Sequence, residues 1–243
     1  MTLLRWVRGS IRFLIYLSIL AVLVLIALSY LRQRPQDLPW TELRLDHPIG
    51  IFTGRKLAKL GDDFAGCRML LDAAGVVYEP LPPVGTDQCV RDDNVRLLKP
   101  GTGQISFAPQ TVAPSCPVVA GLTVWQDQVV QPAAREIFGQ RVVSIRHLGS
   151  YSCRTIAGGD AWSEHATGNA IDIAAFTLAD GTVISLSGHW DEDGPKGRFL
   201  RIIRDGSCDL FSSVLSPDYN AAHADHFHFD QAQRGTMGYR ICR

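Results

Sequence analysis

The chain lacks a surplus of charge of either sign, because its 243 residues include 24 basic and 24 acidic side chains. It also has no lysine-rich patch and no stretch in which basic and aromatic residues alternate. Proteins that bind nucleic acid need a surplus of Lys and Arg to neutralise phosphates. The composition therefore argues against a nucleic-acid partner. The length favours one domain of ordinary size with a small prefix.

The chain also lacks internal repeats, low-complexity tracts and C-x-x-C pairs. The absence of C-x-x-C pairs disfavours a zinc ribbon or a thioredoxin-like site. An even number of scattered cysteines behind an export signal predicts three disulfides in an oxidising compartment. Six buried free thiols are the alternative. We expect Cys67 to pair with Cys89, the most local combination. The six cysteines are Cys67, Cys89, Cys116, Cys153, Cys208 and Cys242.

Charge is missing altogether from residues 13–31, which are flanked by arginines on both sides. As a helix, this run spans about 28 Å, close to the thickness of the hydrocarbon core of a bilayer. Arg5, Arg8 and Arg12 precede it and favour a cytoplasmic N-terminus. Cleavage after a small-x-small site at residues 27–29 is the alternative. We predict an uncleaved, single-pass anchor, because the run is longer than the usual core of a signal peptide.

The rest of the chain reads as an α+β fold: an antiparallel sheet with flanking helices, preceded by one transmembrane helix. We expect an anchor at 1–34, a linker at 35–55, a small subdomain at 56–112 and the main domain at 113–243. Periodicity predicts helices over 56–75, 118–138 and 195–213, with Gly139 ending the second in a left-handed conformation. Strands are expected over 142–146, 169–176, 182–186 and 226–230.

Two segments far apart in the sequence, 163–172 and 223–230, together offer imidazoles and carboxylates. His165 and Asp172 can converge if one ends a loop and the other lies on the strand that follows. In a strand, His226 and His228 share one face, while the phenylalanines between and after them enter the core. A polar edge strand with surface histidines is the alternative. Two imidazoles and a carboxylate that leave one position open are typical of a catalytic zinc site.

At these residues the sequence resembles the superfamily of zinc D-Ala-D-Ala carboxypeptidases and hedgehog-type peptidases. Over roughly 56–243 it is more similar to the bacterial extensin-like C-terminal domain family. The motifs that carry the resemblance are Ser163-x-His165-x-x-Gly168-x-Ala170-x-Asp172, His223-x-Asp225-x-x-His228, Cys116-Pro117 and Ser150-Tyr-Ser-Cys-Arg154. The chain has no Ser-Pro-Pro-Pro runs of the kind found in plant extensins.

The resemblance implies a role for each matching residue. His165, Asp172 and His228 would bind Zn²⁺, and Asp225 would act as the general base. The superfamily often has Glu at that last position. Three further residues have less defined roles. His223 would stabilise the oxyanion when protonated, Arg154 would polarise the scissile carbonyl or form a structural ion pair, and His226 would be an additional ligand or substrate contact.

The expected function is that of a zinc metallopeptidase, a hydrolase that acts on peptidoglycan stem peptides or cross-links. It would be held in the bacterial inner membrane through residues 13–31, with its C-terminal domain in the periplasm. Carboxypeptidase and endopeptidase activity both stay open. The alternative is a non-catalytic module that binds cell wall or protein on the same fold. His189 is expected to pack beside Trp190, and Asp230 has no assigned role.

Overall fold

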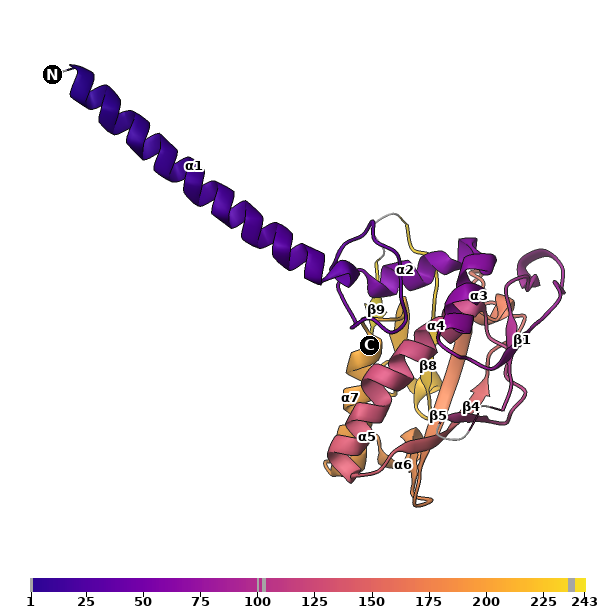
Figure 1. The fold of residues 1–243 in the computed structure, drawn as a ribbon. Helices are drawn as coiled ribbons and strands as arrows, with labels where there is room; N and C mark the ends of the chain where they lie inside the picture. Colours follow the sequence, from indigo (N-terminus) through magenta and orange to yellow (C-terminus); the bar gives the residue numbers. More distant parts are fainter. Residues whose placement is uncertain (1, 100, 102–103, 236–238) are drawn as a thin grey trace.

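The N-terminal helix α1 (Thr2–Gln33) projects away from the rest of the chain (Figure 1). A computed structural model of the protein describes residues 2–99, 101, 104–235 and 239–243. Residues 6–33 of α1 form a helix long and apolar enough to cross a membrane, and its most apolar stretch is not buried by any other part of the chain that the structure describes. This agrees with the predicted anchor in position and length.

The predicted linker is not a free spacer, because it folds back onto the domain. It contains the 3-10 turn η1 (Pro35–Asp37). Gln128 accepts a hydrogen bond from the amide of Ile49 at 3.0 Å and donates one to the carbonyl of His47 at 2.7 Å. Lys56 donates to the hydroxyl of Thr41 at 2.8 Å. These contacts fix the position at which the chain leaves α1.

The first predicted helix of the domain is two helices, α2 (Thr53–Lys59) and α3 (Phe64–Ala73), joined by the 3-10 turn η2 (Leu60–Asp62). Asp63 explains the break, because its side chain caps α3 by accepting a hydrogen bond from the amide of Gly66 at 2.8 Å. A small two-stranded sheet follows. Its elements are β1 (Tyr78–Pro80) and β2 (Val95–Leu97), with the 3-10 turn η3 (Asp87–Cys89) between them.

The second predicted helix is confirmed and is continuous through α4 (Cys116–Trp125), the π-helical turn η4 (Gln126–Val130) and α5 (Gln131–Phe138). Gly139 ends it with φ of 64°, as expected. The third, α7 (Pro195–Ser207), is shorter than predicted and includes Gly206. A Cβ atom at Gly206 would lie 2.4 Å from Val129, so this glycine lets α7 approach η4 closely.

The main sheet has seven strands in the order β3-β4-β5-β8-β7-β9, with β6 paired to β5 off this path. The central pairs are antiparallel, as predicted, but both edge pairs, β3 with β4 and β7 with β9, are parallel. The α+β class is therefore confirmed with a mixed sheet. The strands are β3 (Ser106–Ala108), β4 (Val142–Gly149), β5 (Ala170–Leu178), β6 (Val183–Ser185), β7 (Ser213–Leu215), β8 (Phe227–Asp230) and β9 (Ile241–Cys242).

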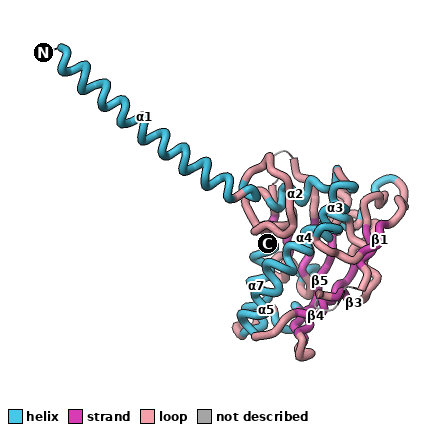
Figure 2. Tube along the Cα trace, viewed as in Figure 1, coloured by secondary structure: helices cyan, strands magenta, loops and turns pink. Residues whose placement is uncertain are grey.

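Helices α4, α5 and α7 pack together along the sheet (Figure 2). The centre of the core is aromatic: the Trp125 ring meets Phe229 edge-on with centroids 5.1 Å apart, and Phe211 stacks on Phe229 at 4.7 Å. Phe227 and Phe229 are fully buried, so the predicted alternation of β8 is confirmed. The alternate residues of β8 therefore face the other side of the sheet.

The predicted boundary near residue 112 does not divide the core. Buried side chains from both sides of it, including Leu71, Val95, Phe107 and Leu122, belong to one continuous hydrophobic cluster. Strand β3 lies before the boundary and pairs with β4 after it. Residues 56–112 therefore support the main domain directly.

All six cysteines form disulfides, but the expected Cys67–Cys89 pair is wrong. The pairs are Cys67–Cys116, Cys89–Cys153 and Cys208–Cys242. Cys67 lies on α3, which packs against α4, the helix that begins at Cys116. Two of the three bridges tie residues 56–112 to the remainder of the domain.

Candidate metal centre

His165, Asp172 and His228 come together on the face of the sheet opposite the aromatic core. Strands β5 and β8 are antiparallel, and Asp172 lies directly across from His228. His165 belongs to the 3-10 turn η5 (Glu164–Thr167), which immediately precedes β5. The two segments that the sequence singled out therefore meet, as expected.

The three potential ligand atoms form a compact triangle. His165 Nε2 lies 3.2 Å from Asp172 Oδ1 and 3.0 Å from His228 Nδ1, and the last two atoms are 3.1 Å apart. Bonds of the usual zinc length at tetrahedral angles place ligand atoms about 3.3 Å apart. The two histidines are almost fully buried, and Asp172 is mostly buried. The donor set and its spacing therefore fit a zinc ion.

Both histidines are oriented by a second hydrogen bond. His165 Nδ1 lies 2.8 Å from the carbonyl oxygen of Ser150, to which it donates, so Nε2 is left to coordinate. His228 Nε2 lies 3.3 Å from Asp230 Oδ2, so Nδ1 faces the triangle. Partners of this kind fix the tautomer and ring angle of metal-binding histidines. Asp230, which has no role assigned from the sequence, therefore orients the His228 ring.

Hydrogen bonds within the triangle shift the pKa values of Asp172 and His228 in opposite directions. Burial alone would raise the pKa of Asp172, but hydrogen bonds from His165 and His228 outweigh it and hold that pKa well below its usual range. Burial also opposes protonation of His228, but its bonds to Asp172 and Asp230 raise its pKa to about 9. The carboxylates of Asp172 and Asp230 thus favour a positive charge on His228.

Gly168 allows the tight turn between His165 and Asp172. Its φ is 74°, and an added Cβ would lie 2.3 Å from Asn94 Nδ2. Its carbonyl accepts hydrogen bonds from the amide of Ser115 at 2.8 Å and the hydroxyl of Ser150 at 3.1 Å. The subdomain at 56–112 therefore packs directly against the turn that carries the first ligand.

A partly buried chain of polar side chains that the sequence did not reveal supports the same turn. The Ser115 hydroxyl donates to Asn169 Oδ1 at 2.8 Å, and Asn169 Nδ2 donates to Glu164 Oε2 at 2.6 Å. Burial raises the pKa of Glu164, while its bond from Asn169 opposes that change. The only hint in the sequence is that these polar residues flank the histidine motif.

His226 is the additional imidazole beside the centre. Its Nε2 lies 3.6 Å from Asp172 Oδ1, and its Nδ1 donates to Asp225 Oδ1 at 2.8 Å. The Asp225 side chain is 61% exposed, whereas that of His226 is 12% exposed. The residue expected to be the general base is therefore joined to the site through His226.

His223 lies on the 3-10 turn η6 (Ala221–His223), beside His226 and His228. Its ring centroid is 5.2 Å from that of His226 and 6.0 Å from that of His228. Burial, with the nearby positive charges of His226 and His228, lowers the pKa of His223 to about 4. Its Nδ1 lies 2.8 Å from Asn220 Oδ1. The expected oxyanion role requires the protonated form, which this environment disfavours.

Arg154 lies on the exposed loop between β4 and η5, and its charge reaches His223. The Cys89–Cys153 disulfide and a hydrogen bond from the amide of Ser163 to the Arg154 carbonyl anchor this loop. Arg154 therefore lies on the exposed side of the centre, near His223.

His189 lies apart from the ligand triangle on α6 (Leu186–His189). Its Nε2 accepts a hydrogen bond from Lys196 at 3.0 Å, which leaves Nδ1 as the donor, 3.1 Å from the carbonyl oxygen of Ser185. These contacts tie the short helix to β6 and α7.

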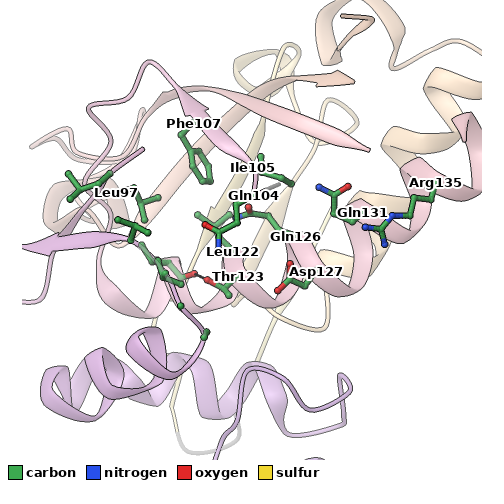
Figure 3. A pocket seen from close by; sticks show the side chains of 16 residues that line it. Leu97, Gln104, Ile105, Phe107, Leu122, Thr123, Gln126, Asp127, Gln131 and Arg135 are labelled. Atoms are coloured by element: carbon green, nitrogen blue, oxygen red, sulfur yellow. Dashed lines mark hydrogen bonds between the residues drawn. The ribbon is translucent and has the colours of Figure 1, made fainter. Parts of the chain in front are cut away.

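A cavity of about 290 Å³ lies elsewhere, between the long helix and strands β2 and β3 (Figure 3). Leu97, Phe107 and Leu122 form an apolar end, while Asp127 and Arg135 are exposed at the other. None of the residues that line it belongs to the ligand triangle or its surroundings.

A family model described as the C-terminus of extensin-like proteins matches residues 65–243. No curated protein and no solved structure matches the chain. The matched region covers most of the chain and includes the whole ligand triangle with its supporting residues. The chain therefore belongs to the extensin-like protein C-terminus family.

Proposed function

We propose that this protein is a zinc-dependent peptidase that acts on peptidoglycan peptides in the periplasm, as a carboxypeptidase or an endopeptidase. The observation that carries the proposal is the triangle of His165, Asp172 and His228, in which separate hydrogen bonds orient both imidazoles toward one point. Zinc bound there would supply Lewis-acid chemistry, polarising a carbonyl group and lowering the pKa of water toward neutrality.

Proton transfer is assigned to the pair formed by Asp225 and His226. The Asp225 carboxylate accepts the Nδ1 proton of His226, which leaves the lone pair of Nε2 directed toward the ligand triangle. His226 would accept a proton at Nε2 from the attacking water and return it to the leaving amine, while the Asp225 carboxylate stabilises the imidazolium in between. Asp225 then serves as a positioning carboxylate and not as the direct base expected from the sequence.

His223 and Arg154 would contact the substrate on the exposed side of the metal centre. The exposed guanidinium of Arg154 can bind a carbonyl or carboxylate group of a peptide. Since Nδ1 of His223 is engaged by Asn220, its Nε2 is the atom available to a substrate N–H group. These roles orient a peptide across the triangle.

Helix α1 would hold the protein in the bacterial inner membrane as an uncleaved, single-pass anchor, with the folded domain in the periplasm. Its length and composition and the arginines before its apolar core support this topology. The three disulfides agree with an oxidising compartment.

Defined stem peptides and cross-linked muropeptides, incubated with the zinc-loaded full chain, test the proposal by mass spectrometry of the products. We expect cleavage of an amide bond by the wild-type protein and a loss of at least about 100-fold in kcat for His226→Ala, with zinc retained. Asp180→Asn, in an exposed hairpin turn, is the matched surface control. Zinc binding without a product from any substrate would instead support the non-catalytic binding module.

A further inference from the structure

A second cavity, of about 200 Å³, lies between α2 and the C-terminal segment and is rich in positive charge. Four cationic side chains and one carboxylate line it: Arg55, Lys59, Arg234, Arg240 and Asp62. They come from segments far apart in the sequence, so the fold itself gathers the charge. None of these residues belongs to the ligand triangle.

Two arginines of this pocket, Arg234 and Arg240, donate hydrogen bonds to backbone carbonyls. Arg240 donates to the carbonyl of Asp209 at 2.9 Å, and its nearest approach to the Asp209 carboxylate is 4.0 Å. Arg234 donates to the Ser212 carbonyl at 2.9 Å. The four cations of the pocket outnumber the three carboxylates within or beside it, those of Asp62, Asp209 and Asp230, so an anion in the pocket would be attracted.

Gly54 brings Arg240 close to α2. A Cβ atom at Gly54 would lie 3.0 Å from Arg240 Cζ and 2.5 Å from the carbonyl oxygen of Asp209. Arg240 is about half-buried, and burial lowers its pKa, although the Asp209 carboxylate opposes that change. A partly desolvated guanidinium group favours an anionic partner with several oxygen atoms, such as a phosphate.

Helix α2, which lines the pocket, lies beside the point where the chain leaves α1 (Figure 1). Lys56, on α2 between two of the lining cations, donates to the carbonyl of Pro35 at 3.4 Å, two residues beyond the end of α1. Asp37 accepts a hydrogen bond from the amide of Ile51 at 2.9 Å. The polar layer of a bilayer extends about 5–8 Å beyond its hydrocarbon core, so the pocket faces the lipid headgroups if α1 spans the membrane.

We propose that this pocket binds the phosphate of an anionic phospholipid from the leaflet in which the anchor ends. The proposal rests on the proposed membrane anchoring and is independent of peptidase activity. Lipid binding would hold the domain against the membrane in one orientation. Arg234 also lies 3.7 Å from Asp230 Oδ2, behind the ligand triangle, so it is not a suitable residue for the test.

The test is native mass spectrometry of the full chain in non-ionic detergent, titrated separately with phosphatidylglycerol, phosphatidylcholine and inorganic phosphate. The wild-type protein should bind one phosphatidylglycerol in preference to phosphatidylcholine. Lys59→Gln should weaken that binding about fivefold, and Asp62→Asn should strengthen it by a similar factor. Lys99→Gln, an exposed lysine outside the pocket, should leave it unchanged.

Misfolding would weaken lipid binding in both variants. Opposite effects of Lys59→Gln and Asp62→Asn on lipid binding would therefore be specific to the charge of the pocket. Equal binding of both lipids, or an equal loss in Lys59→Gln and Lys99→Gln, would overturn the proposal. Phosphate that binds as tightly as phosphatidylglycerol would overturn the assignment to lipid. A separate experiment tests the proposed membrane anchor. If α1 does not span the membrane, alkaline extraction will release the wild-type chain from membranes.

Discussion

Replacing Gly168 with alanine should destabilise the turn that carries His165 by two additive effects. The left-handed conformation at φ of 74° costs a residue with a side chain about 1–2 kcal/mol. The new Cβ would also overlap Asn94 Nδ2 at 2.3 Å, and overpacking of this kind costs about 1–3 kcal/mol. The expected loss in the free energy of unfolding is therefore about 2–5 kcal/mol.

Thermal unfolding followed by near-ultraviolet circular dichroism measures this loss, at about 2–4 °C per kcal/mol for a domain of this size. Gly139→Ala is the matched control, since φ there is 64° and nothing lies within 4 Å of an added Cβ. It should show the conformational cost alone.

A double-mutant cycle with Asn94→Ala separates the two effects. In that background the overlap is gone, so Gly168→Ala should cost at least about 1 kcal/mol less. The same cost in both backgrounds would refute the steric part of the reasoning. A cost no greater than that of Gly139→Ala would refute the packing of the N-terminal subdomain against this turn.

Three further predictions concern charge, orientation and covalent cross-links. Burial, with a neighbouring carboxylate, raises the pKa of Asp93 to about 6, so its contribution to stability is complete below pH 4 and is lost as the pH rises through 6. Asp93→Asn should therefore raise the free energy of unfolding by about 1–2 kcal/mol at pH 7.5 but little at pH 4, as chemical denaturation at both values will show. Asp230→Asn should weaken zinc binding about 10–100-fold in competition with a chelator, whereas Asp180→Asn should not. Replacing Cys89 and Cys153 by serine should cost roughly 2–4 kcal/mol in thermal unfolding, and an unchanged midpoint would contradict a structural role for this bridge.

Strand alternation, a local property, was sufficient to predict the face of the sheet on which His228 lies, whereas the choice of His165, Asp172 and His228 as a ligand set came from the family resemblance. Phe227 and Phe229 are apolar and His228 lies between them, so burial of the phenylalanines determines the face on which the histidine lies. Antiparallel pairing of β5 with β8 then brings Asp172 opposite His228. The anchor and the long helix ending at Gly139 were also predictable, since both depend on local composition and spacing.

Features that depend on the approach of distant segments could not be predicted. The partner of Cys67 is set by the packing of α3 on α4 and not by the distance along the chain. The Asp225–His226 pair was missed because either residue could have faced the centre, and only the turn before β8 decides which does. The parallel strand β9 also depends on a long return of the chain to β7.

The most direct test of the metal centre is zinc-edge X-ray absorption spectroscopy of the zinc-loaded full chain. We predict about one zinc per chain, with two imidazole ligands and otherwise oxygen ligands, all at about 2.0–2.2 Å. His228→Ala should remove one imidazole signal or abolish binding, whereas His189→Ala should change neither. A sulfur ligand, three or more imidazoles, or an unchanged spectrum in His228→Ala would contradict the centre built from His165, Asp172 and His228.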